Sequence, residues 1–172
     1  MAIIRQVRGY NPVFGSDCWL AETAVLIGDI VTGEKCTFWY NAVVRGDVNS
    51  IRIGNNVNIQ DNATIHGTFE KSSTTIGDNV SIGHNAIVHG CTLEENCLVG
   101  MGAIVMDQAV IGKGSIVAAG SVVLEGTKVE PGVIYAGTPA KFVKRIEAKN
   151  QEMLSRIAGN YFKYAGWFQE NR

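Results

Sequence analysis

A chain of 172 residues is long enough to form one domain with a substantial buried core. Its 15 lysines and arginines nearly balance its 16 aspartates and glutamates, which excludes the basic surface expected of a nucleic-acid-binding protein. No apolar run approaches the roughly eighteen residues that a membrane-spanning helix requires, and residues 1–15 lack the apolar centre of a secretory signal, so we expect a cytoplasmic protein that does not bind membranes.

An apolar residue recurs every six positions through most of the chain. A helix, with a period near 3.6 residues, cannot keep a six-residue repeat on one face, whereas short strands joined by tight turns can. The apolar residue would point inward, and a small residue four places later would fit where the backbone crowds the axis. Three hexads would form one coil of a triangular parallel β-helix, with coils about 4.8 Å apart. The inward series is Leu20, Leu26, Thr32, Phe38, Val44, Ile53, Ile59, Ile65, Ile76, Ile82, Val88, Leu93, Val99, Val105, Ile111, Val117, Val123, Val129 and Tyr135.

The repeat predicts an all-β solenoid of hexapeptide repeats over residues 18 to 140, approximately. Beyond it, apolar residues recur at helical spacing. We expect residues 1–147 to form the β-helix domain and residues 148–172 to form a C-terminal α-helix packed along it. The packed face of the helix would consist of Met153, Ile157, Tyr161, Tyr164 with Ala165, and Phe168.

The repeat loses its register at three places, and all three lie near the histidines. Residues are added between Val44 and Ile53 and between Ile65 and Ile76, and one is lost before Leu93. Added residues in a solenoid become loops on one face, which is often the functional one. Residues 67–75 are therefore a candidate lid or rim.

All three histidines fall at outward positions, but on two different faces of the predicted prism. On one face the residue after each inward position gives the column Arg45, His66, His89, Met106 and Leu124. On the preceding face the column reads Tyr40, Asp61, His84, Met101 and Ala119, with Gln60 beside Asp61. His66 and His89 are thus one coil apart and could share a metal, whereas His84 points elsewhere within the same chain.

Contact between the first column of one subunit and the second column of a neighbour would bring three imidazoles together. Such a head-to-tail contact must close into a ring, and a three-faced prism makes a trimer the natural closure. Three neutral imidazoles leave a fourth position open, as in catalytic zinc sites, where bound water ionises near pH 7. Gln60 could orient the hydroxide, and Arg45 could hold an anionic product.

Other interpretations of the same residues remain open. The histidines could be surface residues that bind no metal. A zinc-finger-like set could instead combine two histidines with two cysteines: His84, His89, Cys91 and Cys97. The four cysteines, which include Cys18 and Cys36, contain no CxxC pair, and in a cytoplasmic protein they would be buried free thiols.

Three sequence motifs resemble those of the γ-class carbonic anhydrases and their bacterial homologues. They are AVVRGD at residues 42–47, NIQDN at 58–62 and GHNAIVHG at 83–90. The GTPA sequence at 137–140 is similar to that of hexapeptide-repeat acyltransferases more broadly. The resemblance implies a left-handed β-helix, a homotrimer, and zinc or Fe²⁺ at each subunit interface, with hydration of CO2 to bicarbonate as the reaction.

The resemblance also implies roles for individual residues. His66 and His89 of one subunit and His84 of the next would be the metal ligands. Gln60 would orient the hydroxide, and Arg45 would bind bicarbonate while pairing with Asp47 and Asp61. A tyrosine of the C-terminal helix, Tyr161, would lie near the site.

Two departures from the family pattern predict slow hydration. Val48 stands where active members carry a glutamate, and the acidic loop of those members is reduced to residues 67–75 with Glu70 as its one acid. Both changes remove routes for the proton that each turnover releases. Two alternative functions are acyl transfer or thioester hydrolysis on a coenzyme A substrate, and a non-catalytic, metal-binding trimeric assembly module.

Overall fold

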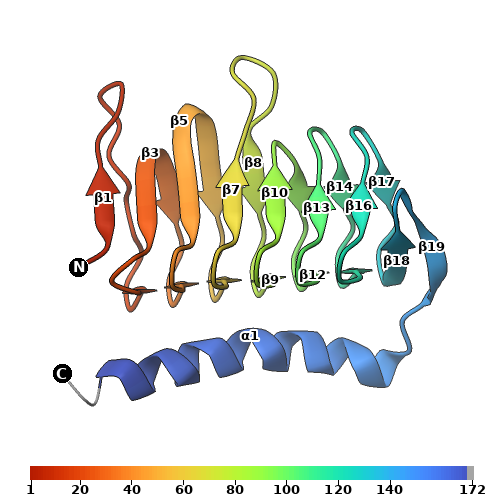
Figure 1. Ribbon diagram of the computed structural model, residues 1–172. Coiled ribbons are helices and arrows are strands. Elements are labelled where there is room, and N and C mark those ends of the chain that lie inside the picture. Colours follow the sequence, from red (N-terminus) through yellow and green to blue (C-terminus); the bar gives the residue numbers. More distant parts are fainter. Residues whose placement is uncertain (170–172) are drawn as a thin grey trace.

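The chain forms a left-handed parallel β-helix of about seven turns followed by one long helix, as the repeat and the resemblance predict (Figure 1). This computed structural model describes residues 1–169. Most strands have only two or three residues, because each face of a coil holds one hexad. The strands are β1 (Ile3–Arg5), β2 (Trp19–Leu20), β3 (Val25–Thr32), β4 (Thr37–Phe38), β5 (Val43–Ile53), β6 (Asn58–Ile59), β7 (Thr64–His66), β8 (Thr74–Ile76), β9 (Ser81–Ile82), β10 (Ile87–His89), β11 (Thr92–Leu93), β12 (Leu98–Val99), β13 (Ile104–Val105), β14 (Val110–Ile111), β15 (Ile116–Val117), β16 (Val122–Val123), β17 (Lys128–Val129), β18 (Val133–Gly137) and β19 (Ala140–Arg145), and the helix is α1 (Ala148–Gln169).

One face of the prism is an eight-stranded sheet in the order β19-β18-β15-β12-β9-β6-β4-β2. The other two faces are joined into one sheet by the long strand β5, whose first residues pair with β7 and whose last residues pair with β8. All pairs between coils are parallel, and only β19 runs antiparallel to its neighbour, β18. The sheet order therefore reproduces the predicted stacking of one coil on the next.

The two insertions into the repeat take different forms. The residues added between Val44 and Ile53 do not form the expected loop, because β5 continues through them and pairs with β3 across a register shift. The residues added after Ile65 do form a loop, at 67–73, which projects beyond the neighbouring coils between β7 and β8 (Figure 1).

The interior of the prism consists of the predicted inward series. Every member is buried except Leu20 and Tyr135, which are partly buried and lie near the two ends of the series. Burying an aliphatic side chain of this size contributes about 1.5–3 kcal/mol. Strands of two residues could not hold the fold alone, so these stacked columns supply most of its stability.

A column of residues with positive φ turns one corner of each coil. Asn62, Asn85, Gly102 and Gly120 occupy equivalent positions one coil apart, with φ between 58° and 67°. Asparagine and glycine adopt this left-handed conformation at the least cost. His84 immediately precedes Asn85, so this turn holds it at the corner after β9.

Helix α1 lies along the eight-stranded sheet and returns the chain toward the end that holds β1 (Figure 1). Its buried residues are Leu154, Ala158 and Ala165. In the first half of the helix the packed face is therefore one residue later than Met153 and Ile157 predicted. In the second half Ala165 is buried as predicted, and the rings of Tyr161 and Phe168 contact that of Trp39. The last residues of the predicted helical segment, 170–172, lie outside the described part of the chain. Nowhere in residues 1–169 does a helix combine the length and apolar character needed to span a bilayer.

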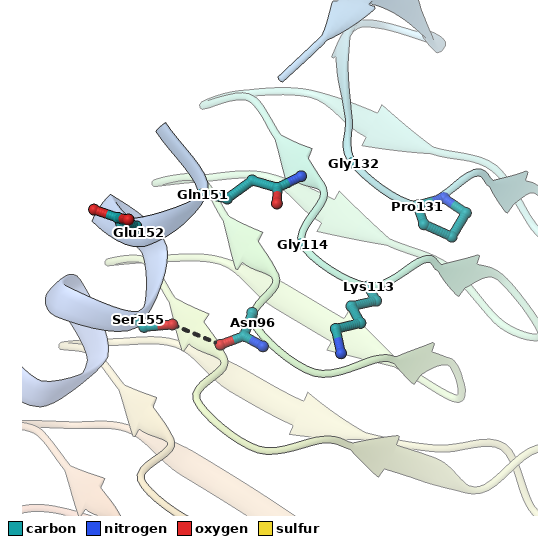
Figure 2. A pocket seen from close by; sticks show the side chains of 8 residues that line it. All are labelled: Asn96, Lys113, Gly114, Pro131, Gly132, Gln151, Glu152 and Ser155. Atoms are coloured by element: carbon teal, nitrogen blue, oxygen red, sulfur yellow. Dashed lines mark hydrogen bonds between the residues drawn. The ribbon is translucent and has the colours of Figure 1, made fainter. Parts of the chain in front are cut away.

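Near the start of α1 the helix stands away from the coils and leaves a cavity of about 440 Å³ (Figure 2). Ser155 Oγ bridges it by donating a hydrogen bond to Asn96 Oδ1 at 2.8 Å. The lining residues are Asn96, Lys113, Gly114, Pro131, Gly132, Gln151, Glu152 and Ser155. None of them is a predicted site residue, so this cavity is separate from the candidate site.

Candidate metal centre

The strand register brings His66 and His89 together. They are paired residues at the ends of the adjacent parallel strands β7 and β10, and His66 Nδ1 lies 3.1 Å from His89 Nε2. Arg45 occupies the same column one coil below, because Val44 of β5 is paired with Ile65 of β7. The predicted column therefore exists as a cluster of side chains.

Each of these two imidazoles contacts a carboxylate through its other nitrogen. His66 Nε2 lies 3.0 Å from Asp47 Oδ1, and His89 Nδ1 lies 2.9 Å from Asp107 Oδ1. Asp47 also forms an ion pair with Arg45. We call Arg45, Asp47, His66, His89 and Asp107 the first half-site.

Asp107 was not predicted from the sequence. It directly follows Met106, which stacks above His89 in the predicted outward column. This position in the repeat is the one sequence feature that indicates that Asp107 lies near His89. No motif contains it, and a single aspartate after an outward residue is an ordinary feature of a solvated surface.

The distance between the two facing nitrogens is compatible with a shared cation. If each histidine donates its N–H to its carboxylate, then Nδ1 of His66 and Nε2 of His89 both present lone pairs across 3.1 Å. Lone pairs at that distance repel unless a cation lies between them. Two nitrogens bound to one tetrahedral zinc at about 2.0–2.1 Å would be roughly 3.3 Å apart, so the observed separation fits such an ion.

The electrostatics of the first half-site favour the neutral form of His66 and the ionised forms of Asp47 and Asp107. Burial lowers the pKa of His66, and the nearby positive charge of Arg45 lowers it further, against the opposing effect of Asp47. Burial by itself raises the pKa of Asp47, but the hydrogen bonds from Arg45 and His66 outweigh it and leave the pKa lowered. Burial likewise opposes the net lowering of the pKa of Asp107, which results from hydrogen bonds donated by Ser72, Thr68 and His89.

His84 lies at the corner after β9 and has its own carboxylate. Its Nδ1 is 2.8 Å from Asp61 Oδ2 in the coil below, and its side chain is 38% exposed. Gln60, beside Asp61, is buried, and its Nε2 donates to Asn58 Oδ1 at 2.9 Å. This bond leaves Gln60 Oε1 free to accept another. We call Gln60, Asp61, His84 and Tyr161 the second half-site.

Tyr161 of α1 lies in the same groove as Gln60 and His84. The groove has a volume of about 340 Å³ and a largely apolar lining. Burial raises the pKa of Tyr161, and the negative charge of Asp61 raises it further, so the phenol keeps its proton at neutral pH. The helix thus places a tyrosine in the groove of Gln60 and His84, where the resemblance implied one.

The two half-sites do not combine within one chain. His66 and His89 end strands of the large sheet, whereas His84 follows a strand of the eight-stranded sheet. Within residues 1–169, no three or more His, Cys, Asp or Glu side chains are grouped so that they could hold a metal ion. Arg45 pairs with Asp47, and Asp61 with His84, so an Arg45–Asp61 contact between subunits stays a prediction.

The zinc-finger-like interpretation is wrong. Cys91 and Cys97 are buried in the interior of the prism, away from the surface columns that hold His84 and His89. Burial also raises the pKa of each thiol to about 12. All four cysteines are free, as predicted, but only three of them are buried, because Cys18 is partly exposed.

The stacked hexads define a hexapeptide-repeat β-helix protein, and comparison with known families agrees. The family described as bacterial transferase hexapeptide (six repeats) matches residues 90–125, and the hexapeptide repeat of succinyl-transferase matches residues 73–106. The chain is 35% identical over 167 residues to a carbonic anhydrase of Geobacillus kaustophilus, covering 97% of this chain and 91% of that protein. The chain belongs to the γ-class carbonic anhydrase family.

Other relatives show how widely the fold is used. Gamma carbonic anhydrase 2, mitochondrial, of Arabidopsis thaliana is 41% identical over 160 residues, which cover 90% of this chain and 58% of the plant protein. A hexapeptide transferase family protein from Anaplasma phagocytophilum has a similar structure (TM-score 0.92, 40% identity, 96% of this chain and 98% of that chain). So does a Bacillus cereus protein described as a candidate acetyltransferase (TM-score 0.95, 33% identity, 99% of both chains).

Proposed function

We propose that the protein is a metal-dependent carbonic anhydrase that interconverts CO2 and bicarbonate at the subunit interfaces of a homotrimer. His66 and His89 of one subunit and His84 of the next would hold the metal. The observation that carries this proposal is the pair of facing nitrogens, Nδ1 of His66 and Nε2 of His89, with each ring bonded to a carboxylate on its other side.

The donor set fits a catalytic zinc site. Each histidine has one nitrogen against an aspartate, namely Asp47, Asp61 or Asp107, which leaves its other nitrogen for a metal. Carboxylate–histidine pairs of this kind orient metal ligands and raise their basicity. Imidazole ligands suit Fe²⁺ as well as Zn²⁺. When bound, the metal would act as a Lewis acid that makes water a nucleophile near neutral pH.

The surface around both half-sites supports a contact between subunits. Met101, in the column of His84, is 58% exposed, and Met106 and Leu124, in the column of His66 and His89, are 38% and 48% exposed. Joining the two faces would cover these apolar side chains and complete the ligand set in one step. Because the contact is head-to-tail, it must close into a ring.

The remaining side chains have complementary roles in this proposal. Arg45 presents a guanidinium at the edge of the first half-site and would bind bicarbonate. Gln60 Oε1 would accept a hydrogen bond from the attacking water and so orient it. Asp61 fixes His84, and the protonated phenol of Tyr161 would donate a hydrogen bond within the groove.

One purified sample can test the proposal through its mass and its metal content. We expect light scattering to give a trimer and metal analysis to give close to one zinc or iron per chain. Stopped-flow assays of the same sample should detect CO2 hydration that is lost in H66A. A monodisperse monomer that retains one metal per chain would contradict the interface site, and a metal-loaded trimer without hydration activity would favour an assembly module.

Acyl transfer or thioester hydrolysis is the second candidate, because both solved structures named above carry transferase descriptions. Turnover of acetyl coenzyme A with release of free thiol would support it. The product released distinguishes the two functions, because CO2 hydration releases a proton and no thiol.

A further inference from the structure

Asp107 connects the loop at 67–73 to His89. Its Oδ1 lies 2.9 Å from His89 Nδ1 and accepts a hydrogen bond from Ser72 Oγ at 2.6 Å. Its Oδ2 accepts a hydrogen bond from Thr68 Oγ1 at 2.9 Å. One carboxylate thus receives two hydroxyl groups from the loop and one imidazole from β10.

The backbone beside His89 is shaped to admit this carboxylate. Gly90 has φ of +55°, and a Cβ there would lie 1.9 Å from Asp107 Oδ1 and 2.2 Å from Ser72 Oγ. Any side chain at this position would displace both groups. The Asp107 side chain is only 16% exposed, so the loop hydroxyls replace water as its partners.

We infer that Asp107 is a positioning residue that holds His89 with its Nδ1 protonated and its Nε2 directed at the metal, and that the loop holds Asp107 through Thr68 and Ser72. The inference rests on the metal site proposed above. Under this inference, the loop at 67–73 has a role other than proton transfer. Its conformation would determine how tightly the site binds the metal ion.

The two histidines of the first half-site would then be positioned differently. Asp47, the partner of His66, belongs to the same long strand as Arg45 and is held by its guanidinium. Asp107, the partner of His89, forms no ion pair with an arginine or lysine within residues 1–169, and its other partners are the loop hydroxyls. A disturbance of the loop should therefore act on His89 and leave His66 in place.

The loop has a further attachment that provides a control. Lys71 Nζ forms an ion pair with Glu125 Oε1 at 2.7 Å, without touching Asp107. Replacing Lys71 with alanine removes an anchor of the same loop but keeps both hydroxyl groups on the carboxylate. K71A is therefore matched to the T68A/S72A double variant.

The first test replaces Asp107 itself. In metal-free D107N, nitrogen NMR of the imidazoles should show that His89 loses its preference for Nδ1 protonation, while His66 keeps its own tautomer. Zinc affinity should fall about ten- to hundredfold, with the trimer mass unchanged. D107A provides a second variant with the carbonyl acceptor removed, and it should give at least the same loss.

The second test compares the loop variants. T68A/S72A should weaken zinc binding and shift the His89 tautomer in the same direction as D107N, and K71A should leave both at wild-type values. Equal effects of K71A and T68A/S72A would overturn the loop part of the inference. A wild-type tautomer and zinc affinity in D107N would overturn all of it.

The metal site and the role of Asp107 can be refuted separately. If wild-type protein binds no metal at pH 7.5, the proposed function is wrong, yet the tautomer measurement on metal-free protein still decides whether Asp107 positions His89. If the wild-type protein binds zinc and D107N binds it equally well, the metal site stands and the role of Asp107 does not.

Discussion

His84 Nδ1 lies 2.8 Å from Asp61 Oδ2, one coil below it, at the corner where strands β9 and β6 of the eight-stranded sheet end. This pair fixes His84 on a face that neither His66 nor His89 shares. If all three histidines bind one ion, the ion must lie between chains. The arrangement predicts complementation between inactive variants.

Refolding H66A together with H84A should restore metal binding that neither variant has alone. A chain with H84A still offers His66 and His89, and a neighbour with H66A still offers His84, so that junction is intact. Metal bound per chain, measured after removal of excess zinc, should rise above the value of either parent. CO2 hydration should rise with it.

The matched control for complementation is a mixture of H66A and H89A. Both positions belong to the first half-site, so no chain in that mixture offers His66 and His89 together. Metal binding should stay at the level of the parents. If mixed trimers of H66A and H84A, identified by mass, bind no more metal than this control, the shared site is wrong.

Hydration of CO2 should be slow and should depend on buffer concentration. Val48 provides no carboxylate, and Glu70 is the one acid left in the loop, so we expect most protons to leave through buffer. V48E should raise the rate in weak buffer and reduce the dependence, as measured by stopped flow. A fast rate in the wild type that does not respond to buffer would mean that another group transfers the proton.

The metal-free protein should lose stability as the pH falls from 8 to 5. The pKa of His66 is lowered in the folded state, so the unfolded chain binds the proton first, near its ordinary value of 6.5. The contribution of His66 is complete above that value and is lost as the pH falls toward the folded pKa. The ionised forms of Asp47 and Asp107, whose pKa values are also lowered, matter only nearer their ordinary value of 3.8.

Urea unfolding in the presence of a chelator, measured across this pH range, tests the assignment to His66. H66Q should unfold with a smaller loss of stability between pH 8 and 5 than the wild type. An unchanged pH profile in H66Q would show that the imidazole of His66 is not the group responsible.

The thiol groups should differ sharply in reactivity. Hydrogen bonding to Cys36 lowers the pKa of the half-buried Cys18 to about 6, against the opposing effect of burial. Burial raises the pKa values of Cys91 and Cys97 to about 12. One thiol per folded chain should react with Ellman's reagent at pH 7.5, and C18S should abolish this reaction. Rapid reaction of a second thiol would mean that the prism interior opens.

The sequence predicted the features that depend on the six-residue period. The period alone identifies the inward series and the outward columns, and so it placed His66 beside His89 and His84 above Asp61. Asp107 was missed because its partners Thr68 and Ser72 lie in a loop outside the repeat, where position in the sequence does not determine position in space. The resemblance led to Tyr161, since helical spacing alone does not select one aromatic residue.

Two other differences between the predicted and the observed structure have simple physical causes. In the first half of α1 the buried residues are Leu154 and Ala158 rather than Met153 and Ile157. The small Ala158 lets the helix approach the sheet there, whereas a count of large apolar residues favours its neighbour Ile157. The residues after Val44 stay in β5 because β3 offers a long partner strand there. Pairing partners in a solenoid come from another coil, so their length is not visible in the local sequence.

The antiparallel strand β19 has a consequence for how large the molecule can become. A parallel β-helix exposes open backbone at its ends, and a second chain could continue the stack indefinitely. Here the last coil is followed by a strand that runs the opposite way, and its exposed residues include Lys141, Lys144 and Arg145. An incoming coil would meet the wrong strand direction and the charges of Lys141 and Lys144. End-to-end polymerisation is thereby discouraged at this terminus, which leaves the sides of the prism free for association into particles of fixed size.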